Sequence, residues 1–330
     1  MTLLAVDGLT VAFRTGRGEV TAVEDLSFTL DADEVLGLVG ESGSSKSVSA
    51  LAILGLLPRP AARVVGGRVG FEGANLLTLP ERRLRRLRGP GIGMIFQEPM
   101  SSLNPVFTIG DQITETLRAH EQIGPAAARA RAVALLDRVG IPSAAHRLQD
   151  YPHQLSGGQR QRVMIAIALS CNPRLLIADE PTTALDVTIQ AQILDLLLDL
   201  RAERGMAVLL ITHNMGVVAE TADRVLVMYA GRIAEQAPVA ALFDSPAHPY
   251  TSALLSCVPA LDQDLRRLPA IPGSLPDPAR RPPGCRFAPR CALHISACDD
   301  RPPPLLSIAP GHEAACIRTA EALSPRERVG

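Results

Sequence analysis

The chain has 330 residues, which is enough for one large domain with an appendage or for two domains. Hydrophobic residues make up 47% of it and aromatic residues only 3%, so the core must be built mainly from Ala, Val, Ile and Leu. Lys and Arg number 33 against 34 Asp and Glu, and this balance excludes a general electrostatic attraction to nucleic acid or anionic lipid. No apolar run reaches about 18 residues, and residues 1–7 lack the features of a signal peptide, so we expect a cytosolic protein.

Two N-terminal segments, residues 3–13 and 19–30, alternate apolar and polar side chains. This period of two predicts antiparallel strands joined by a turn at residues 16–18. Phe13 ends the first strand, and two roles are open for it: stacking on a purine ring, or packing in the core.

The segment that organises the chain is residues 40–47, between the apolar run 35–39 and the helix-like run 48–54. A strand that turns through glycines into a helix starting with Lys-Ser is the geometry of a phosphate cradle, where backbone N–H groups and the helix dipole face the anion. Lys46 is expected to reach the β- and γ-phosphates of a nucleotide, and Ser47 to ligate Mg²⁺. The candidate loop residues are Gly40, Ser42, Gly43, Ser44, Ser45, Lys46 and Ser47, with Ser45 in place of the motif's second glycine.

The middle of the chain departs from a simple alternation of strands and helices. Residues 68–73 and 91–96 predict strands, and the second of these ends at Gln97. The basic segment 81–88 has a single apolar stripe, which is typical of a short surface helix, with a nucleic-acid contact as the alternative. Residues 106–150 have helical patterning, so we predict a helical subdomain inserted into an α/β core.

Two later stretches carry chemistry. The turn Ser156-Gly157-Gly158-Gln159 precedes the helical run 163–169 and offers free backbone donors to an anion. The apolar run 175–178 predicts a buried parallel strand that ends in Asp179 and Glu180, at the sheet edge where open α/β folds bind ligands. Asp179 can hold Mg²⁺, and Glu180 can polarise a water for in-line attack on a γ-phosphate.

The following segments complete the core. A helix is predicted over residues 189–200, a buried strand over 207–211, and an edge hairpin over 224–236 with its turn at Gly231. His213 follows the buried strand, where it can hydrogen-bond a γ-phosphate or serve a purely structural role.

The composition changes beyond residue 245. Residues 269–310 hold too many prolines for regular helices or interior strands, and such a region usually needs a cross-link or a bound metal to be stable. Four cysteines with the spacing C-x5-C-x6-C-x17-C can supply it: Cys285, Cys291, Cys298 and Cys316. In a reducing compartment their clustering favours metal over disulfides, and spacings wider than those of zinc ribbons lean toward an iron–sulfur cluster, with zinc or unligated thiols as alternatives.

Five motifs occur in the order and spacing of one superfamily: Gln97, residues 155–159, residues 176–180, Ala184-Leu185-Asp186 and His213. The chain thus resembles the nucleotide-binding subunits of ATP-binding-cassette (ABC) transporters. Further segments narrow the resemblance to the oligopeptide, dipeptide and nickel importer ATPases: residues 96–105, 151–154, 186–193 and 248–251.

This resemblance implies an α/β fold, a P-loop NTPase core of the ABC type with an antiparallel β subdomain, an inserted helical subdomain and an irregular, cysteine-rich C-terminal appendage. The nucleotide-binding domain would span residues 1–245, with its helical subdomain at about 99–165. Residues 246–330 would form a C-terminal domain of the peptide-importer type, whose four cysteines hold a [4Fe–4S] cluster.

The resemblance also implies a mechanism. Two such domains pair head to tail, so that the cradle of one and the signature turn, residues 156–159, of the other enclose one ATP. The implied roles are adenine stacking for Phe13, Mg²⁺ binding for Ser47, Gln97 and Asp179, general base for Glu180, a γ-phosphate contact for His213 and a place in the D-loop for Asp186. Opening and closing would drive membrane partners that dock near residues 97–110.

The implied partners are a second ABC ATPase subunit, identical or different, two transmembrane permease subunits and an extracellular substrate-binding protein, with no nucleic acid. The subunit would lie peripherally at the cytoplasmic face of the membrane. Ser45 departs from the family's pattern, and because a residue with a Cβ resists the dihedrals that glycine permits, we expect weakened ATP binding or turnover at this chain's own site.

Alternative functions follow from the same residues. Nickel is the nearest alternative cargo. A soluble ABC ATPase acting on DNA or ribosomes is disfavoured by the single signature and by the short span of about 60 residues between Gln97 and Ser156. A catalytically silent regulatory subunit is consistent with Ser45, although Glu180 and His213 argue against it.

Overall fold

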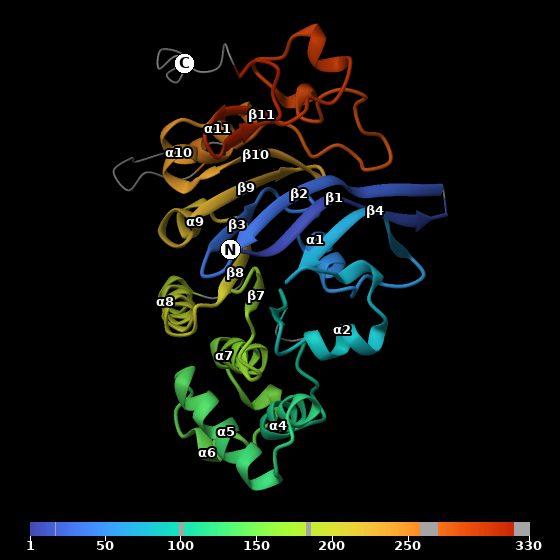
Figure 1. Ribbon diagram of the computed structural model, residues 1–330. Helices are drawn as coiled ribbons and strands as arrows, with labels where there is room; N and C mark the ends of the chain where they lie inside the picture. The colour runs from blue at the N-terminus through green and yellow to red at the C-terminus, as the bar shows by residue number, and fades with distance from the viewer. Residues whose placement is uncertain (17, 99–101, 183–185, 258–269, 320–330) are drawn as a thin grey trace. The chain divides into compact units, whose positions relative to one another are not determined.

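The computed structural model describes residues 1–16, 18–98, 102–182, 186–257 and 270–319 (Figure 1). Its internal contacts divide the chain into two compact units. The first unit comprises residues 1–3, 30–34 and 78–211, and the second comprises residues 4–29, 35–77 and 212 onward.

The first unit is built on a parallel ladder of β6 (Ile92–Ile95), β7 (Leu175–Asp179) and β8 (Ala207–Thr212). Every residue of β7 and β8 is buried, which explains why both strands are continuous apolar runs rather than alternating ones. The strands predicted at these positions are confirmed, and their carboxyl ends meet at one edge, where ligands bind in folds of this class.

Helices make up most of the remainder of this unit. Their bounds are α2 (Glu81–Leu87), α4 (Ile109–His120), α5 (Pro125–Arg138), α6 (Ala144–Arg147), α7 (Gly157–Leu169) and α8 (Val187–Arg204), with a short 3₁₀ turn at Pro152–Gln154. Another 3₁₀ turn, Leu76–Thr78, has two of its three residues in the second unit. The helical pattern of residues 106–150 is confirmed, and α2 buries none of its side chains, as expected for a surface helix. Helix α7 packs closely on β6, because a Cβ on Gly93 would lie 2.6 Å from the carbonyl oxygen of Ala168.

The second unit begins with an antiparallel sheet in the order β2 (Gly18–Asp31), β1 (Thr2–Thr15), β4 (Ala62–Phe71) and β5 (Ala74–Asn75). Val6 of β1 lies opposite Val69 of β4, and both are buried. Alternation of buried and exposed positions along these strands is typical of a sheet with one face on the core. The two predicted N-terminal strands are confirmed.

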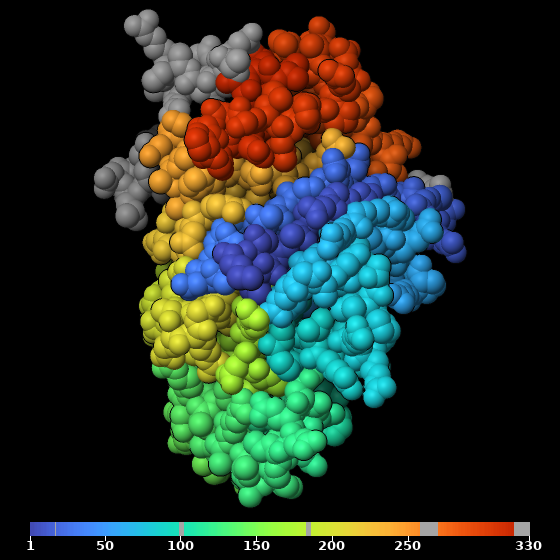
Figure 2. Space-filling view, in the orientation of Figure 1, coloured from blue at the N-terminus to red at the C-terminus, as the bar shows by residue number. Residues whose placement is uncertain are grey.

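A second group of strands contains β3 (Val35–Val39), which is parallel to β9 (Arg224–Tyr229), and β10 (Arg232–Pro238), which is antiparallel to β9. The hairpin and its turn at Gly231 are confirmed, but its predicted place at the edge of the sheet is wrong. Two strands from the C-terminal tail continue the ladder: β12 (His312–Ala314) pairs with β10, and β11 (Leu306–Ala309) pairs with β12. In Figure 2 the red tail accordingly lies against the orange segment that holds β10.

The helices of this unit are α1 (Lys46–Ile53), α9 (Met215–Thr221), α10 (Val239–Asp244) and α11 (Pro249–Ser256). The proline-rich tail adds only 3₁₀ turns at Ala288–Arg290 and Ser296–Asp299, because proline removes backbone donors and fixes φ. Among the described residues of the chain, no helix is both long and apolar enough to span a bilayer.

Candidate nucleotide site

The phosphate loop connects β3 to α1 through backbone conformations that favour glycine. Gly40 has a φ of 150° and Gly43 a φ of 86°. A Cβ on Gly40 would lie 2.2 Å from the carbonyl oxygen of Met228, so only glycine fits where the loop passes β9. The turn therefore has the tight, strand-to-helix path that a phosphate cradle requires.

Ser45 immediately precedes α1 and has a φ of 76° and a ψ of 22°, which is the left-handed region. A residue with a Cβ pays roughly 1–2 kcal/mol to stay there, whereas glycine does not. Its hydroxyl makes no capping hydrogen bond to α1. The expectation that this position demands glycine-like dihedrals is confirmed, and its effect on ATP stays a prediction.

The Lys46 ammonium lies back over the loop. Its Nζ donates to the carbonyl oxygens of Gly40 at 2.7 Å and Glu41 at 3.1 Å, and the residue is only 5% exposed. These two carbonyl dipoles orient the ammonium over the loop. Ser47 follows in the first turn of α1, where the free N–H groups and positive end of the helix dipole lie.

Two further predicted residues belong to the same unit as the phosphate loop. Phe13 lies near the end of β1, opposite Ala62, and is half-buried, so its ring is partly open to contacts. His213 directly follows β8 and is exposed, immediately before the N-cap residue Asn214 of α9. The structure thus places both at strand ends, as predicted, and neither is locked in the core.

The carboxylates belong to the first unit. Asp179 ends β7 and is 3% exposed, and Glu180 follows it at 8% exposed. The Glu180 backbone N–H donates to the carbonyl oxygen of Ile211 at 2.8 Å. Glu180 also has a φ of 47°, a conformation uncommon for a residue with a long side chain and found disproportionately at functional sites.

Gln97, which follows β6, is brought to the same place. Its Nε2 donates to Oε2 of Glu180 at 3.0 Å. This bond orients the carboxylate of Glu180. The structure thus brings together two predicted site residues, the amide after β6 and the carboxylate after β7.

Sequence reasoning missed Gln161, which holds the chain after Glu180. Gln161 lies in the first half of α7, is 3% exposed, and donates through Nε2 to the carbonyl oxygen of Pro181 at 2.6 Å. A buried amide must find a partner, so this bond ties the loop that carries the carboxylate to the helix that follows the signature turn. The available signal was a polar side chain on an otherwise apolar helix face.

The signature turn is a helix N-terminus with a complete capping box. The Ser156 hydroxyl accepts from the Gln159 backbone N–H at 3.3 Å, and the Ser156 N–H donates to Oε1 of Gln159 at 3.0 Å. The caps leave the N–H groups of Gly157 and Gly158 at the start of α7 as donors for an anion. A Cβ on Gly158 would lie 3.2 Å from the Ile189 side chain, so the second glycine lets α7 approach α8.

Asp186 caps α8, because its Oδ1 accepts from the backbone N–H of Ile189 at 3.0 Å. This is a local structural role for a residue that the family resemblance places in the D-loop. The neighbouring motif residues Ala184 and Leu185 lie outside the described residues, as do Pro99, Met100 and Ser101 of the segment after Gln97.

The four tail cysteines line one small pocket of about 20 Å³, together with His248, Phe287 and other mainly apolar residues. All four are free thiols. Burial raises the pKa of Cys316 to about 11 and also raises the pKa values of Cys285 and Cys291. Within the described part of the chain, however, no three His, Cys, Asp or Glu side chains are spaced to hold a metal ion.

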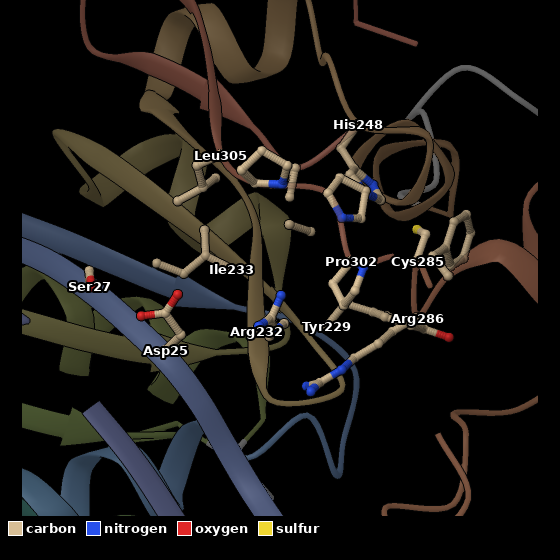
Figure 3. A pocket seen from close by; sticks show the side chains of 15 residues that line it. Asp25, Ser27, Tyr229, Arg232, Ile233, His248, Cys285, Arg286, Pro302 and Leu305 are labelled. Carbon is tan, nitrogen blue, oxygen red and sulfur yellow. The ribbon is translucent and has the colours of Figure 1, made fainter. Parts of the chain in front are cut away.

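A larger cavity of about 210 Å³ lies next to the cysteine pocket, and Cys285 lines both. Figure 3 shows Cys285 and Arg286 from the tail facing the same space as Tyr229 and Arg232 from the β9–β10 hairpin. The tail is therefore packed on the hairpin rather than detached from it.

A glycine-turned phosphate loop in a chain with paired carboxylates at the end of a parallel strand defines the class of nucleoside-triphosphate-hydrolysing P-loop proteins. The "ABC transporter" family matches residues 23–183, and the "Oligopeptide/dipeptide transporter, C-terminal region" family matches residues 234–298.

Relatives make the assignment narrower. A protein of Brucella abortus (strain 2308) that carries the name peptide import ATP-binding protein is 56% identical over 95% of this chain and 94% of its own length. A protein of Brucella melitensis biotype 1 with the same name is 52% identical over 97% of this chain and 98% of its own length. The chain therefore belongs to the ABC transporter family, in the group of ATP-binding subunits with the oligopeptide/dipeptide type of C-terminal region.

Solved structures agree with this fold. The dimeric, post-hydrolysis ATP-binding cassette MJ0796 bound to ADP and phosphate matches with a TM-score of 0.65 and 26% identity, over 72% of this chain and 98% of that one. CbiO1 from Clostridium perfringens, part of the ABC transporter complex CbiONQ, matches with a TM-score of 0.62 and 27% identity, over 74% of this chain and 91% of that one.

Proposed function

We propose that this protein binds ATP at residues 40–47, hydrolyses it with Glu180 as the base, and thereby powers a membrane importer of oligopeptides or dipeptides. The observation that carries the proposal is the Gln97–Glu180 hydrogen bond at the end of β7, in a chain whose phosphate loop holds a nearly buried Lys46. Relatives at 52–56% identity that are named for peptide import support the cargo class.

Each side chain then has a defined task. Lys46 attracts the β- and γ-phosphates, and Glu180, oriented by Gln97, takes the proton of the attacking water. If Mg²⁺ is bound, it would supply positive charge that offsets the charge of the phosphates. The remaining tasks are Mg²⁺ binding by Ser47, Asp179 and Gln97, adenine stacking by Phe13, and a γ-phosphate hydrogen bond from His213.

The signature turn acts on a partner's nucleotide. The Ser156 hydroxyl oxygen accepts from the Gln159 N–H, so its O–H can donate to an anion from outside, together with the first N–H groups of α7. A second ABC ATPase subunit, identical or different, supplies that anion at its own phosphate loop, and the dimeric form of a solved relative supports such pairing. Two permease subunits and an extracellular substrate-binding protein complete the importer, with this subunit peripheral at the cytoplasmic face.

Reconstitution with the permeases tests the function. We expect ATP-dependent uptake of a labelled dipeptide or oligopeptide, abolished by Lys46→Ala and by Glu180→Gln. The matched control is Arg83→Ala in α2, an exposed residue, which should leave uptake unchanged. Uptake of Ni²⁺ without peptide uptake would assign the alternative cargo, and uptake that persists in both variants would reject the proposed site.

We also propose that the four tail cysteines hold a [4Fe–4S] cluster. Thiolates are the ligands of such a cluster, and all four thiols line one pocket whose other lining residues include no carboxylate, although the thiols would have to draw closer together to bind it. The wide chain spacing of the thiols favours this group over zinc. The cluster would staple a proline-rich tail that forms little regular structure.

Purification without oxygen tests the cluster. We expect about four irons and a comparable amount of acid-labile sulfide per chain, with broad visible absorbance. Cys291→Ser should lower the iron content, whereas Cys257→Ser, outside the set, should not. Stoichiometric zinc, or full-length folded protein with neither metal, would overturn this part of the proposal.

A further inference from the structure

The tail reaches the phosphate loop through one bidentate ion pair. Arg290, at the end of the 3₁₀ turn between Cys285 and Cys291, donates from Nη1 to Oε2 of Glu41 at 2.7 Å and from Nη2 to Oε1 at 2.9 Å. The Arg290 side chain is 6% exposed and that of Glu41 is 25% exposed. Paired N–H···O bonds of this fork geometry fix both position and orientation.

The guanidinium is itself held firmly. Arg290 Nε donates to the carbonyl oxygen of Pro272 at 2.7 Å, and Nη1 donates to the Tyr229 hydroxyl at 3.3 Å. Its central carbon lies 5.8 Å from the Tyr229 ring centroid and 5.9 Å from that of Phe287, within the range of cation–π attraction. Contacts with the tail and with the β9–β10 hairpin therefore fix the position of the Arg290 guanidinium, to which the Glu41 carboxylate is hydrogen-bonded.

The backbone of Glu41 is fixed as well. Its N–H donates to the hydroxyl of Tyr250 at 2.9 Å, and Tyr250 in α11 is fully buried. Its carbonyl oxygen accepts from Lys46 Nζ. Thus two residues beyond position 245 bind Glu41, Arg290 through its carboxylate and Tyr250 through its backbone N–H. The Glu41 carbonyl oxygen in turn helps to orient Lys46.

An acidic residue inside an anion-binding loop needs a countercharge. An unpaired Glu41 carboxylate beside the loop would repel phosphates, and its repulsion would be strong because the site is partly buried. Pairing with Arg290 offsets the Glu41 charge and so reduces that repulsion.

We propose that Arg290 and Tyr250 are positioning residues for ATP binding, which hold and neutralise Glu41 so that the C-terminal tail forms one wall of the phosphate loop. This inference rests on the proposed function, because it assumes that residues 40–47 bind the nucleotide. It extends the nucleotide site beyond the region matched by the ABC transporter family, residues 23–183, into the tail.

A double-mutant cycle on the full-length protein tests it. The probe is a fluorescent ATP analogue with Mg²⁺, and the readout is its dissociation constant. Arg290→Ala should weaken binding on the order of tenfold or more, because a partly buried carboxylate is left unpaired. Adding Glu41→Gln should restore most of that affinity, since the repelling charge is gone. Arg301→Ala, an exposed arginine of the same tail, is the control and should bind as the parent does.

Hydrogen exchange supplies a second readout that does not depend on nucleotide. Tyr250→Phe removes only the acceptor of the Glu41 N–H, so exchange at that amide should accelerate while distant amides keep their rates. If Arg290→Ala does not fold, Arg290→Lys retains the charge but loses the fork, and it should give a smaller loss of affinity that Glu41→Gln does not rescue.

The outcomes separate this inference from the proposed function. Loss of binding in Lys46→Ala together with unchanged binding and exchange in Arg290→Ala and Tyr250→Phe would overturn the inference alone. Unchanged binding in Lys46→Ala would instead show that the nucleotide binds elsewhere. Equal affinity losses in Arg290→Ala and in its double variant with Glu41→Gln would also count against the charge-neutralising role.

Discussion

The amide of Gln97 donates a hydrogen bond of 3.0 Å to the carboxylate of Glu180, although 83 residues separate them in the chain. Each follows a buried strand, Gln97 after β6 and Glu180 after β7, and the parallel pairing of those strands brings their ends together. The bond gives the carboxylate a fixed direction, which a general base needs before the water arrives.

We expect Glu180→Gln to lower the ATPase rate by about 10²–10⁴-fold while ATP still binds, because the amide keeps the shape but cannot accept a proton. Gln97→Ala should give a smaller loss, since it removes orientation rather than the base. Steady-state turnover and nucleotide binding on the same preparations measure both. A fully active Glu180→Gln protein would exclude this carboxylate as the base.

Ser45 offers a test of backbone strain. Because its φ is 76°, Ser45→Gly relieves roughly 1 kcal/mol of left-handed strain and should raise ATP affinity or turnover at this chain's own site several-fold. Ser45→Ala keeps the Cβ and removes only the hydroxyl, so it should not produce the gain. ATPase rates of the assembled transporter provide the measurement, and identical rates for Ser45 and Ser45→Gly would contradict the prediction.

Gly40 has no room for a side chain. In Gly40→Ala the new Cβ would meet the Met228 carbonyl oxygen at 2.2 Å, so the loop or β9 must shift, and we expect a loss of about 2 kcal/mol in stability as well as of nucleotide binding. Gly16→Ala is the matched control, because nothing lies within 4 Å of its added Cβ. Chemical denaturation of both variants decides the point: equal midpoints would show that the approach to β9 can relax.

His248 predicts how stability depends on pH. Burial lowers its pKa from 6.5 to about 4, and its Nδ1 accepts from the Tyr250 N–H at 3.0 Å, which requires that nitrogen to be unprotonated. The unfolded chain therefore binds the proton more readily, so this contribution to stability is complete above pH 6.5 and is lost as the pH falls toward 4.

Between pH 7 and pH 5 the loss attributable to His248 should be about 2 kcal/mol. His248→Asn keeps an N-cap acceptor but does not titrate, so urea unfolding should show a weaker decline over that interval. The exposed His146, replaced by Asn, should leave the decline unaltered. The same decline in both variants would mean that other groups cause it.

Local patterns of apolar and polar residues were sufficient to predict many of the strands and helices. The apolar runs that became β3, β7 and β8 indicated strands, and for residues 175–178 a buried parallel one, and all three strands are buried along their whole length. The order Gly-x-x-Gly-x-x-Lys-Ser indicated the cradle only together with the signature turn and the two acids downstream, because glycine- and serine-rich turns before helices are common.

Contacts between residues far apart in the chain could not be predicted from the sequence. The hairpin β9–β10 was predicted to lie at the edge of the sheet, but β12 pairs with β10. The sequence did not indicate β12, because a strand of three residues in a proline-rich tail is too short to show a periodic pattern. The Gln161–Pro181 bond was missed for a similar reason, since the sequence does not show which residue a buried amide contacts.

The sequence by itself determined the chemistry available to this protein: a lysine and serine after a glycine turn, two acids after an apolar strand, and a second glycine turn that caps a helix. Only the tertiary structure decided that the tail shares in the loop, because Arg290 and Glu41 lie 249 residues apart and their pairing depends on where the chain folds. Residue types fix which interactions are possible, and packing selects among them because each buried charge must be met by a partner.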